Sequence, residues 1–424
     1  MKNGEATLKL SQTGKGIDWL KQFDPDDQGD AAKLIDHMRL VSHQEFAEQL
    51  QSLIIERAKA VDGPIGLYAE REIRKWKGVP NRLFKEQRGN KNRRAYGVGP
   101  QPVSPTKAYD PKVGSEGIVA WLITQLCNRE PKLFLNHPGP DAIRKNRIRT
   151  CFLVTDFVGS GTRVINYLSA AWRIFSVKSW VSYKLFKFEV VAFSGTDKGV
   201  SKVEKHRCRP SISLVQSCPT IETVFKDEEA ERIRQICIAY DPERSDLIDS
   251  LGFLGTGALI AFAHSCPNNT PRLLHKSGKR WFPLFPARVT GEVSSVFEDR
   301  RDKDSLIDRL QRMNENRLAS GEWFEQASKD GRSLILLLAA LRKSPRFDEA
   351  LSRNTGLTIP EIKIFIHALN EWKWIDDDRC LTDDGYKQLR YIRNIKATTQ
   401  EVLSSVSEGL YYPQQLRAPR NASS

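Results

Sequence analysis

The chain has 424 residues, and 66 Lys and Arg against 52 Asp and Glu give it a formal net charge of +14. This length favours two or three domains, and the positive excess favours an anionic partner such as nucleic acid, nucleotide or phosphosugar. No apolar run reaches the ~18 residues of a membrane helix, and we expect a cytoplasmic protein without a signal peptide. The seven cysteines are scattered without Cys-x-x-Cys spacing, which argues against disulfides and a zinc motif.

The N-terminal part divides into an expected arm and an expected helix. Residues 1–30 are polar and rich in Gly and Asp, so we expect a flexible arm over 1–40. Ser42 to Glu45 has the pattern of a capping box, and apolar residues follow at helical spacing from Phe46 to Ala58. This pattern predicts a helix that ends before Gly63.

A basic stretch follows from Arg71 to Arg94, with ten basic residues against two acidic ones and with Trp76 and Phe84 between them. One interpretation is a solvated basic face. The other is an electrostatic path for nucleic acid or a polyphosphate, and the charge excess favours it. A second basic cluster, residues 144–149, precedes the central strand.

A strongly apolar helix is expected over 118–126, after the segment Gly114-Ser-Glu-Gly117. Ser115 is a natural N-cap for it. Beyond this helix, short apolar runs predict strands over 132–135, 188–195 and 212–216. Alternation of strands and helices from about 118 to 216 predicts an α/β fold with a mostly parallel sheet.

The most informative stretch is residues 149–163. Cys151 to Val154 reads as a buried strand, Gly159-Ser160-Gly161-Thr162 as a loop of small residues, and the sequence after Arg163 as a helix. Such a unit can cradle a phosphate with free amides and the positive end of a helix dipole. The alternative is an ordinary tight turn between strand and helix. A serine-hydrolase elbow is excluded, because Val158 stands where that motif needs glycine.

This stretch resembles the ribose-5-phosphate loop of the type I phosphoribosyltransferases, and residues 154–163 fit its register without a gap. Asp156 matches the second of the two acidic residues of that motif, whereas Thr155 replaces the first. The resemblance implies that Gly159, Ser160, Gly161, Thr162 and Arg163 bind phosphate and ribose and that Asp156 is catalytic. It also implies that a loop before the 118–126 helix handles pyrophosphate, which makes Ser115 and Glu116 candidates.

A second distinctive stretch runs from Gly252 to Arg272, where an apolar segment ends abruptly in polar residues. It reads either as a turn-rich loop or as a polar lid edged with aromatic rings. With the phosphate loop, it resembles the phosphoribosyltransferase-like proteins of microbial conflict systems, found in retrons and other anti-phage loci, over roughly residues 40–295. The resemblance implies a catalytic role for His264 and contacts to a base or leaving group from Asn268, Asn269 and Arg272. No metal-ligand motif is present in the sequence.

The C-terminal part is expected to contain a helical connector over 296–330, a winged helix-turn-helix over 331–395 and a tail over 396–424. Three helical segments, a hairpin around Asp376-Asp-Asp378 and the segment LTDDGYKQL support the winged helix. The charges of the expected recognition helix cancel and the wing tip is acidic, so protein docking is as compatible with this module as DNA reading.

The resemblance implies an anti-phage effector of the retron toxin/antitoxin type, formed by a phosphoribosyltransferase-like domain over 41–295 with an N-terminal helical part and the winged helix. Its expected ligand is PRPP or a nucleotide that contains ribose 5-phosphate, with Mg²⁺, and its expected partners are nucleic acid or a ribonucleoprotein, including a reverse transcriptase with its RNA–DNA. Thr155 leaves open a transferase, an enzyme that cleaves a nucleotide glycosidic bond, and a non-catalytic, nucleotide-sensing regulator that binds DNA or a partner.

Overall fold

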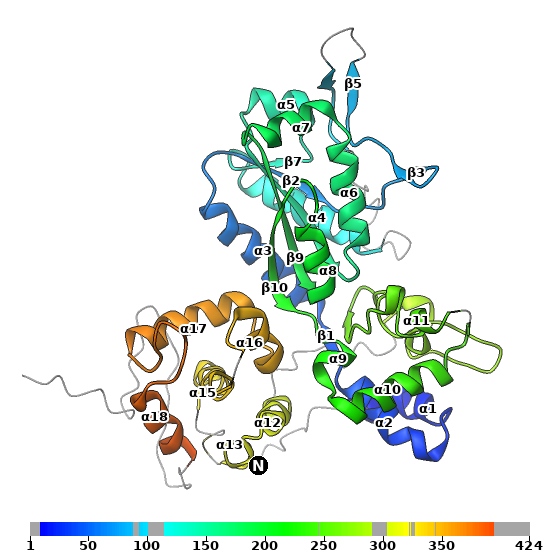
Figure 1. The fold of residues 1–424 in the computed structure, drawn as a ribbon, viewed down its shortest axis with the longest axis vertical. Helices are drawn as coiled ribbons and strands as arrows, with labels where there is room; N and C mark the ends of the chain where they lie inside the picture. Colours follow the sequence, from blue (N-terminus) through cyan, green and yellow to red (C-terminus); the bar gives the residue numbers. More distant parts are fainter. Residues whose placement is uncertain are drawn as a thin grey trace, which may run out of the picture. The chain divides into compact units, whose positions relative to one another are not determined.

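The chain forms two compact units, residues 8–298 and residues 299–424 together with 1–7, each drawn in Figure 1. The structure is a computed structural model. It describes residues 9–87, 93–100, 114–244, 246–290, 303–321, 323, 327–343 and 345–393.

The first unit is built around a five-stranded parallel sheet with the strand order β10-β9-β8-β2-β7. The predicted α/β class and mostly parallel sheet are thereby confirmed. Because all strands run the same way, their carboxyl ends share one edge and their amino ends share the opposite edge. The strands are β2 (Ile65–Ala69), β7 (Phe134–Asn136), β8 (Thr150–Val158), β9 (Lys187–Gly195) and β10 (Ser211–Ser217).

Helices cover both faces of this sheet, which is why its central strands are apolar on both sides. Two helices, α3 and α4, contact one face, and α6, α7 and α8 lie with α5 on the other (Figure 1). These helices are α3 (His43–Lys59), α4 (Gly114–Arg129), α5 (Pro140–Lys145), α6 (Thr162–Trp172), α7 (Phe175–Ser182) and α8 (Asp197–Glu204).

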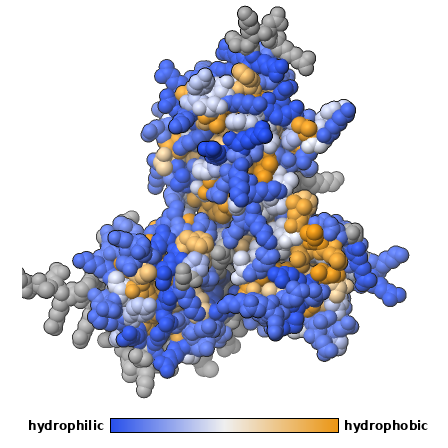
Figure 2. All heavy atoms as spheres, in the orientation of Figure 1, coloured by the Kyte–Doolittle hydropathy of each residue, from blue (hydrophilic) through white to orange (hydrophobic). Residues whose placement is uncertain are grey.

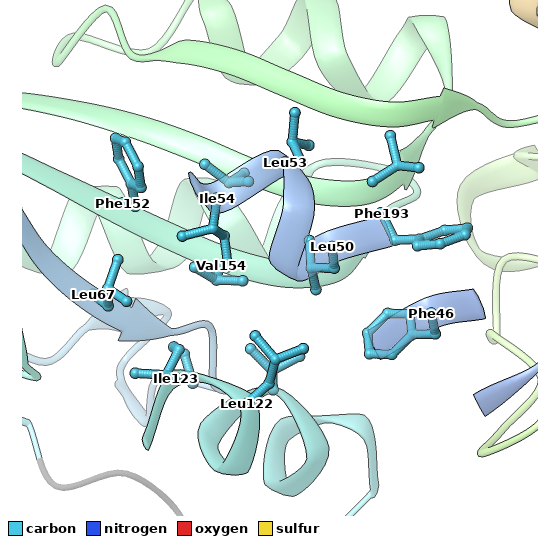
Figure 3. Close-up of a cluster of buried hydrophobic side chains, with 14 of the residues drawn as sticks. Phe46, Leu50, Leu53, Ile54, Leu67, Leu122, Ile123, Phe152, Val154 and Phe193 are labelled. Atoms are coloured by element: carbon cyan, nitrogen blue, oxygen red, sulfur yellow. The ribbon is translucent and has the colours of Figure 1, made fainter. Parts of the chain in front are cut away.

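The core beneath α3 and α4 follows the predicted apolar spacing. Ser42 caps α3 by accepting a hydrogen bond from the backbone N–H of Glu45 at 3.1 Å. Phe46 and Leu50 of α3 and Val154 of β8 are buried members of one apolar cluster, drawn in Figure 3, in which the Phe46 ring lies 5.5 Å from that of Phe193 of β9. Burial of each such side chain contributes about 1.5–3 kcal/mol, and this layer holds α3 against β9 and β10 and α4 against β2 and β8.

Residues 9–40 differ from the expected flexible arm. They form helices and a strand whose apolar side chains, including Trp19, Leu34 and Ile35, pack with residues 221–285 into a second core. The apolar residues over 1–30 are too few and too irregularly spaced to predict these helices. The helices are stabilised instead by apolar partners that lie some 200 residues further along the chain. The elements are η1 (Leu10–Gln12), α1 (Gly14–Leu20), α2 (Pro25–Asp36), β1 (Arg39–Val41), α9 (Ile221–Val224), α10 (Asp227–Ala239), α11 (Leu247–Ser250), η2 (Phe253–Gly255), β11 (Ile260–Phe262), η3 (Arg272–Leu274) and η4 (Pro286–Arg288).

The basic stretch forms two short hairpins instead of one continuous path. The first pairs β3 (Lys75–Trp76) with β4 (Val79–Pro80), and the second pairs β5 (Lys85–Gln87) with β6 (Arg94–Tyr96). Trp76 is exposed while Phe84 is buried. The expected basic residues Arg88 and Lys91 lie outside the described residues.

The second unit contains the predicted helices of a winged helix, followed by a hairpin turn with a bridge between Ile375 and Leu381. No described helix of either unit is long and apolar enough to cross a membrane. The helices are α12 (Lys303–Arg312), α13 (Asn316–Ala319), α15 (Lys329–Leu341), α16 (Asp348–Thr355), α17 (Ile359–Glu371) and α18 (Asp383–Arg393).

Candidate functional site

The loop after β8 leaves the start of a helix open. β8 ends at Val158, and Gly161 adopts a left-handed backbone (φ 71°) as the N-cap of α6. No side chain caps α6, although the Ser160 hydroxyl lies 3.4 Å from the N–H of Thr162. The first-turn amides and the positive end of the helix dipole are therefore available to an anion.

The loop is held from behind by α8. Thr196 donates a hydrogen bond to the carbonyl of Gly159 at 2.7 Å and accepts one from the N–H of Gly199 at 3.0 Å. A Cβ placed at Gly199 would lie 2.0 Å from the Gly159 carbonyl oxygen. Backbone therefore packs directly against backbone here, which fixes the position of the loop.

Asp156 lies at the carboxyl end of β8 and faces His264, which follows β11. The His264 Nε2 is 3.5 Å from a carboxylate oxygen of Asp156, and the His264 side chain is 2 % exposed. Burial acts to raise the pKa of Asp156, but His264, Arg163 and Ser115 outweigh it and hold that pKa at about 2. Asp156 is therefore a carboxylate at neutral pH.

The His264 ring is held by aromatic neighbours. It stacks on Phe262 with centroids 5.0 Å apart and meets Phe46 edge-on at 4.9 Å. Neither ring nitrogen makes a hydrogen bond within the described part of the chain. Packing therefore fixes the ring, with Nε2 facing the Asp156 carboxylate at 3.5 Å, and this position suits a group that meets a ligand.

A buried carboxylate that the sequence did not reveal lies beside Thr155. Glu70 follows β2, and its Oε2 is 3.4 Å from the Thr155 hydroxyl, which in turn lies 3.2 Å from Asp156. Arg163 joins this cluster, 3.0 Å from Glu70 and 2.6 Å from Glu116. The first acidic position of the motif is threonine, yet a carboxylate from the neighbouring strand lies next to it.

Glu70 predicts a pH dependence of stability. Burial raises the pKa of Glu70 to about 7, helped by Asp156 and Glu116 and opposed by Arg163. The folded chain therefore keeps a proton on Glu70 between about pH 4.5 and 7 where the unfolded chain releases it, so stability falls as pH rises through that window. With ~1.4 kcal/mol per pKa unit, the loss reaches about 3 kcal/mol.

Denaturant unfolding at pH 5 and pH 8 checks this dependence. Glu70→Gln is expected to lose less stability than the parent between the two pH values, by about 3 kcal/mol at most. Glu72→Gln, at an exposed position two residues away, is the control and should behave as the parent does. Equal losses in all three proteins would contradict the assignment.

Of the predicted site residues in the 252–272 stretch, Asn269 contacts the phosphate loop, whereas Asn268 and Arg272 make other contacts. A Cβ at Gly159 would lie 2.2 Å from the Asn269 side chain, so Asn269 packs directly on the phosphate loop. Asn268 is exposed, and its carbonyl accepts a hydrogen bond from the Phe253 N–H at 2.9 Å. Arg272 instead pairs with Asp249 at 2.9 Å and Asp241 at 3.4 Å, which gives it a structural role away from the loop.

Ser115 and Glu116 do approach the site, as sequence reasoning predicted. Ser115 helps to lower the pKa of the Asp156 carboxylate and Glu116 pairs with Arg163, so the start of α4 lies beside the end of β8. Ser115 lies inside α4, which begins at Gly114, and is not a cap. Among the five loop residues, Arg163 is the one whose side chain is engaged by carboxylates.

The residues around Asp156 suit a metal that arrives with its ligand. No group of three His, Cys, Asp or Glu side chains among the described residues could hold an ion by itself. Mg²⁺ commonly binds through one or two carboxylates together with phosphates and water. Asp156 and Glu116 satisfy that requirement if a diphosphate supplies the other oxygens.

Sequence reasoning missed Glu70 and Thr196. A signal existed for Glu70, because the apolar run Ile65–Ala69 between Pro64 and Glu70 has the length and composition of a buried strand. Recognition of that strand would have placed Glu70 at the same edge as Asp156. Thr196 carries no comparable signal, since its role depends on the contact between α8 and the loop.

An exposed apolar surface lies near the loop, on the side of Asn269. Leu247, Ile248, Phe253 and Leu254 are exposed, and Figure 2 shows hydrophobic atoms gathered over α11 and η2. The Asn269 side chain donates to the Phe253 carbonyl at 3.4 Å while it touches Gly159. This surface therefore begins within one residue of the phosphate loop.

Comparison with known proteins agrees with this geometry. No curated protein and no solved structure matched the chain. A family model described as wHTH-PRTase associated matches residues 335–418, which include α17 and α18. A model described as PRTase-CE matches residues 17–287, which span the sheet, the loop and both halves of the second core. The chain therefore belongs to the PRTase-CE family, with a winged-helix module of the phosphoribosyltransferase-associated type at its C-terminal end.

Proposed function

We propose that this protein is an enzyme that acts at the anomeric carbon of a ribose-5-phosphate compound, either PRPP or a nucleotide. The observation that supports this most directly is the uncapped start of α6 next to Asp156, which is ionised at neutral pH. A 5′-phosphate on the amides of residues 159–163 would place the attached ribose toward Asp156. The hydroxyls of Ser160 and Thr162, 3.1 Å apart, supply further donors.

In the proposed reaction the bond from C1′ to the leaving group breaks, and the leaving group keeps the electron pair. Positive charge develops on the ribose ring and is stabilised by the Asp156 carboxylate. A nitrogen nucleophile or water then forms the new bond to C1′ and releases a proton. His264, whose Nε2 lies 3.5 Å from Asp156, would contact the base or leaving group.

The remaining polar groups fit the two ends of such a ligand. Asn269 lies at the loop, beside the exposed Phe253 and Leu254, which suits a flat heterocycle with an amide contact at its edge. Glu116 and Ser115 lie in the first turn of α4, beside Arg163 and Asp156, where a diphosphate with Mg²⁺ would sit. When bound, Mg²⁺ would neutralise the charge that a diphosphate leaving group gains.

A panel experiment tests the proposal. The full chain is incubated with Mg²⁺ and PRPP, NAD⁺, ATP, GTP or nucleoside monophosphates, and released diphosphate or free base is measured by mass spectrometry. Turnover of one compound supports the enzyme. Binding of ribose 5-phosphate by calorimetry without any turnover would instead support a sensor.

The second candidate function is a non-catalytic regulator in which this site senses a nucleotide and the winged helix binds DNA or a partner protein. The specific observation in its favour is the match to a winged-helix module. Its wing tip carries the exposed acids Asp376, Asp377 and Asp378, which oppose binding to phosphates. Ile364 of α17 is exposed, which suits a protein partner better.

Neutralisation of the wing separates DNA binding from protein docking. If the wing does not contact DNA, replacement of Asp376, Asp377 and Asp378 by Asn should change duplex affinity by less than about twofold. A wing that lies on DNA loses three repulsions, so affinity should rise and its salt dependence should steepen by about 2–3 units. Fluorescence anisotropy with a labelled duplex at several salt concentrations measures both.

At the level of the cell, we propose a cytoplasmic effector of anti-phage defence of the retron toxin/antitoxin type. This proposal rests on the resemblance of the phosphate loop and of the 252–272 stretch to proteins of such systems. It predicts a stable complex with a reverse transcriptase and its RNA–DNA. Affinity purification of the full chain from its native cells, followed by sequencing of bound nucleic acid, tests it.

A further inference from the structure

The amino-terminal edge of the sheet, opposite the phosphate loop, carries a concentrated positive charge. Residues 140–149, 178–187 and 202–210, which lead into β8, β9 and β10, contain eleven basic residues against two acidic ones. These three strands are adjacent and parallel, so their entries lie side by side with ~4.8 Å between strands. We call these residues the amino-edge surface.

Three of these cations occupy backbone positions that disfavour side chains. Arg147, Lys184 and Arg209 have φ values of 53°, 57° and 45°, in the left-handed region where glycine is preferred. Arg147 and Lys184 each close a helix in a Schellman motif, shown by bonds from Ile148 to Ile143 and from Leu185 to Trp180. Glycine is the usual residue at that position, and here a long cation stands there instead.

The helix dipole offers a structural explanation for part of this pattern, because cations near the C-terminus of a helix are favourable. It does not extend to Arg149 and Lys187, which lie at strand starts, where the Lys187 N–H bonds the Arg149 carbonyl. It also does not explain a charge excess repeated before three adjacent strands. A requirement for positive charge at this edge explains all of these positions together.

The second hairpin extends the same surface. Arg144 donates to the Ala95 carbonyl of β6 at 2.7 Å, and the Ala95 N–H donates to Ser176 of α7 at 2.9 Å. β5, α5 and α7 accordingly lie together at one end of the sheet in Figure 1, while α8 begins at the other. Burial and the neighbouring Arg94 both lower the pKa of Arg144, while Asp141, whose carboxylate lies 3.1 Å from the Arg144 guanidinium, opposes that shift.

Exposed aromatic rings lie among these cations. Tyr183 is 77 % exposed, Phe175 is 54 % exposed and Tyr96 is 45 % exposed. Exposed rings between Lys and Arg side chains are the usual platform for single-stranded nucleic acid, because bases stack on them while the cations follow the phosphates.

We propose that the amino-edge surface binds single-stranded nucleic acid, at a site separate from the ribose-phosphate loop. The two sites lie at opposite ends of β8, whose nine residues span roughly 26 Å. A strand bound at this edge therefore does not enter the candidate active site. This surface, rather than the acidic wing, is the part of the chain that holds a nucleic-acid partner.

The left-handed cations allow a matched test in the full chain. In the first variant, Arg147, Lys184 and Arg209 are replaced by Gly, which suits the backbone and removes three charges. In the control, Arg244, Arg288 and Lys373 are replaced by Gly, which removes the same charge from exposed positions that also have positive φ. Both variants should keep the melting temperature of the parent within a few degrees and bind ribose 5-phosphate equally.

Anisotropy with a labelled 20-nucleotide single strand, as RNA and as DNA, gives the result. We expect the first variant to bind at least about tenfold more weakly at 0.15 M salt. The slope of log affinity against log salt concentration should fall by about 2, because each of three lost phosphate contacts contributes ~0.7. The control should stay within about twofold of the parent. Equal affinity of both variants would overturn the proposal.

The rings distinguish a single strand from other polyanions. Phe175→Ala with Tyr183→Ala should weaken single-strand binding at least about fivefold, since base stacking contributes ~1–3 kcal/mol per base, and should leave heparin binding unchanged. The contrary outcome is that the triple glycine variant loses affinity for heparin, duplex DNA or phosphatidylglycerol vesicles as much as for the single strand, while the ring substitutions change nothing. That result would show a general polyanion surface and overturn the single-strand assignment.

Discussion

Asp156→Asn is expected to lower turnover by about 100–1000-fold while the fold is retained. The substitution keeps the shape and much of the hydrogen bonding of the side chain but removes the charge that would stabilise a cationic ribose. Loss of one preorganised electrostatic group typically costs ~2.7–4 kcal/mol in the transition state. The measurement is single-turnover chemistry with whichever compound of the panel the parent consumes.

Asp156→Asn should also lower stability, by about 2 kcal/mol at pH 7. The folded-state pKa of about 2 lies below the usual 3.8, so the carboxylate stabilises the fold above pH 3.8, and this contribution is lost as pH falls toward 2. Kinetics must therefore be measured well below the melting temperature of the variant. Glu222→Gln, at an exposed ion pair with Lys198, controls for the loss of one negative charge.

The same substitution distinguishes effector from sensor in cells. Expression without natural partners should be harmful for the parent and harmless for Asp156→Asn, and nucleotide pools should change with the parent alone. Equal toxicity of both proteins, or unchanged nucleotide pools even after phage challenge, would contradict the enzyme.

Much of the fold could be predicted from the sequence because several of its elements are determined by residues that are neighbours in the chain. The apolar run at 151–154 and the small residues at 159–162 fix a strand, a loop and a helix start within fifteen residues, and the structure places them as predicted. The α3 cap was predictable for the same reason, because it depends on one hydrogen bond and on spacing within a single element. The parallel sheet was predictable from the order of elements, because strands and helices alternate along the chain.

The rest of the site depends on contacts between distant segments. Glu70 meets Thr155 across two strands, and His264 meets Asp156 from a segment more than 100 residues further along the chain. Residues 9–40 fold because their apolar side chains pack on residues 221–285, which their own spacing does not reveal. The sequence also does not reveal the partners of Arg272, because the acids that pair with it, Asp241 and Asp249, lie more than 20 residues earlier in the chain.

Gly161→Val is expected to weaken binding of ribose 5-phosphate by about tenfold or more, roughly 1.4 kcal/mol. Gly161 has φ 71°, and a Cβ there would lie 2.7 Å from the Gly199 carbonyl oxygen and 3.0 Å from Val203. A β-branched residue therefore forces the loop away from α8, and the amides of α6 turn from the phosphate. The strain of a left-handed side chain alone costs about 1–2 kcal/mol of stability.

Gly78→Val separates loss of binding from loss of stability. Gly78 also has a left-handed backbone (φ 76°), but no atom lies within 4 Å of its Cβ position, and it belongs to the β3–β4 hairpin. Both variants should melt at a lower temperature than the parent, whereas only Gly161→Val should lose affinity in calorimetry below both melting temperatures. Ser160→Ala, which removes a hydroxyl and keeps every amide, should lose only about 0.5–1.5 kcal/mol of binding free energy for ribose 5-phosphate. If Gly161→Val binds as the parent does while folded, the segment after β8 is an ordinary turn and the ligand must bind elsewhere.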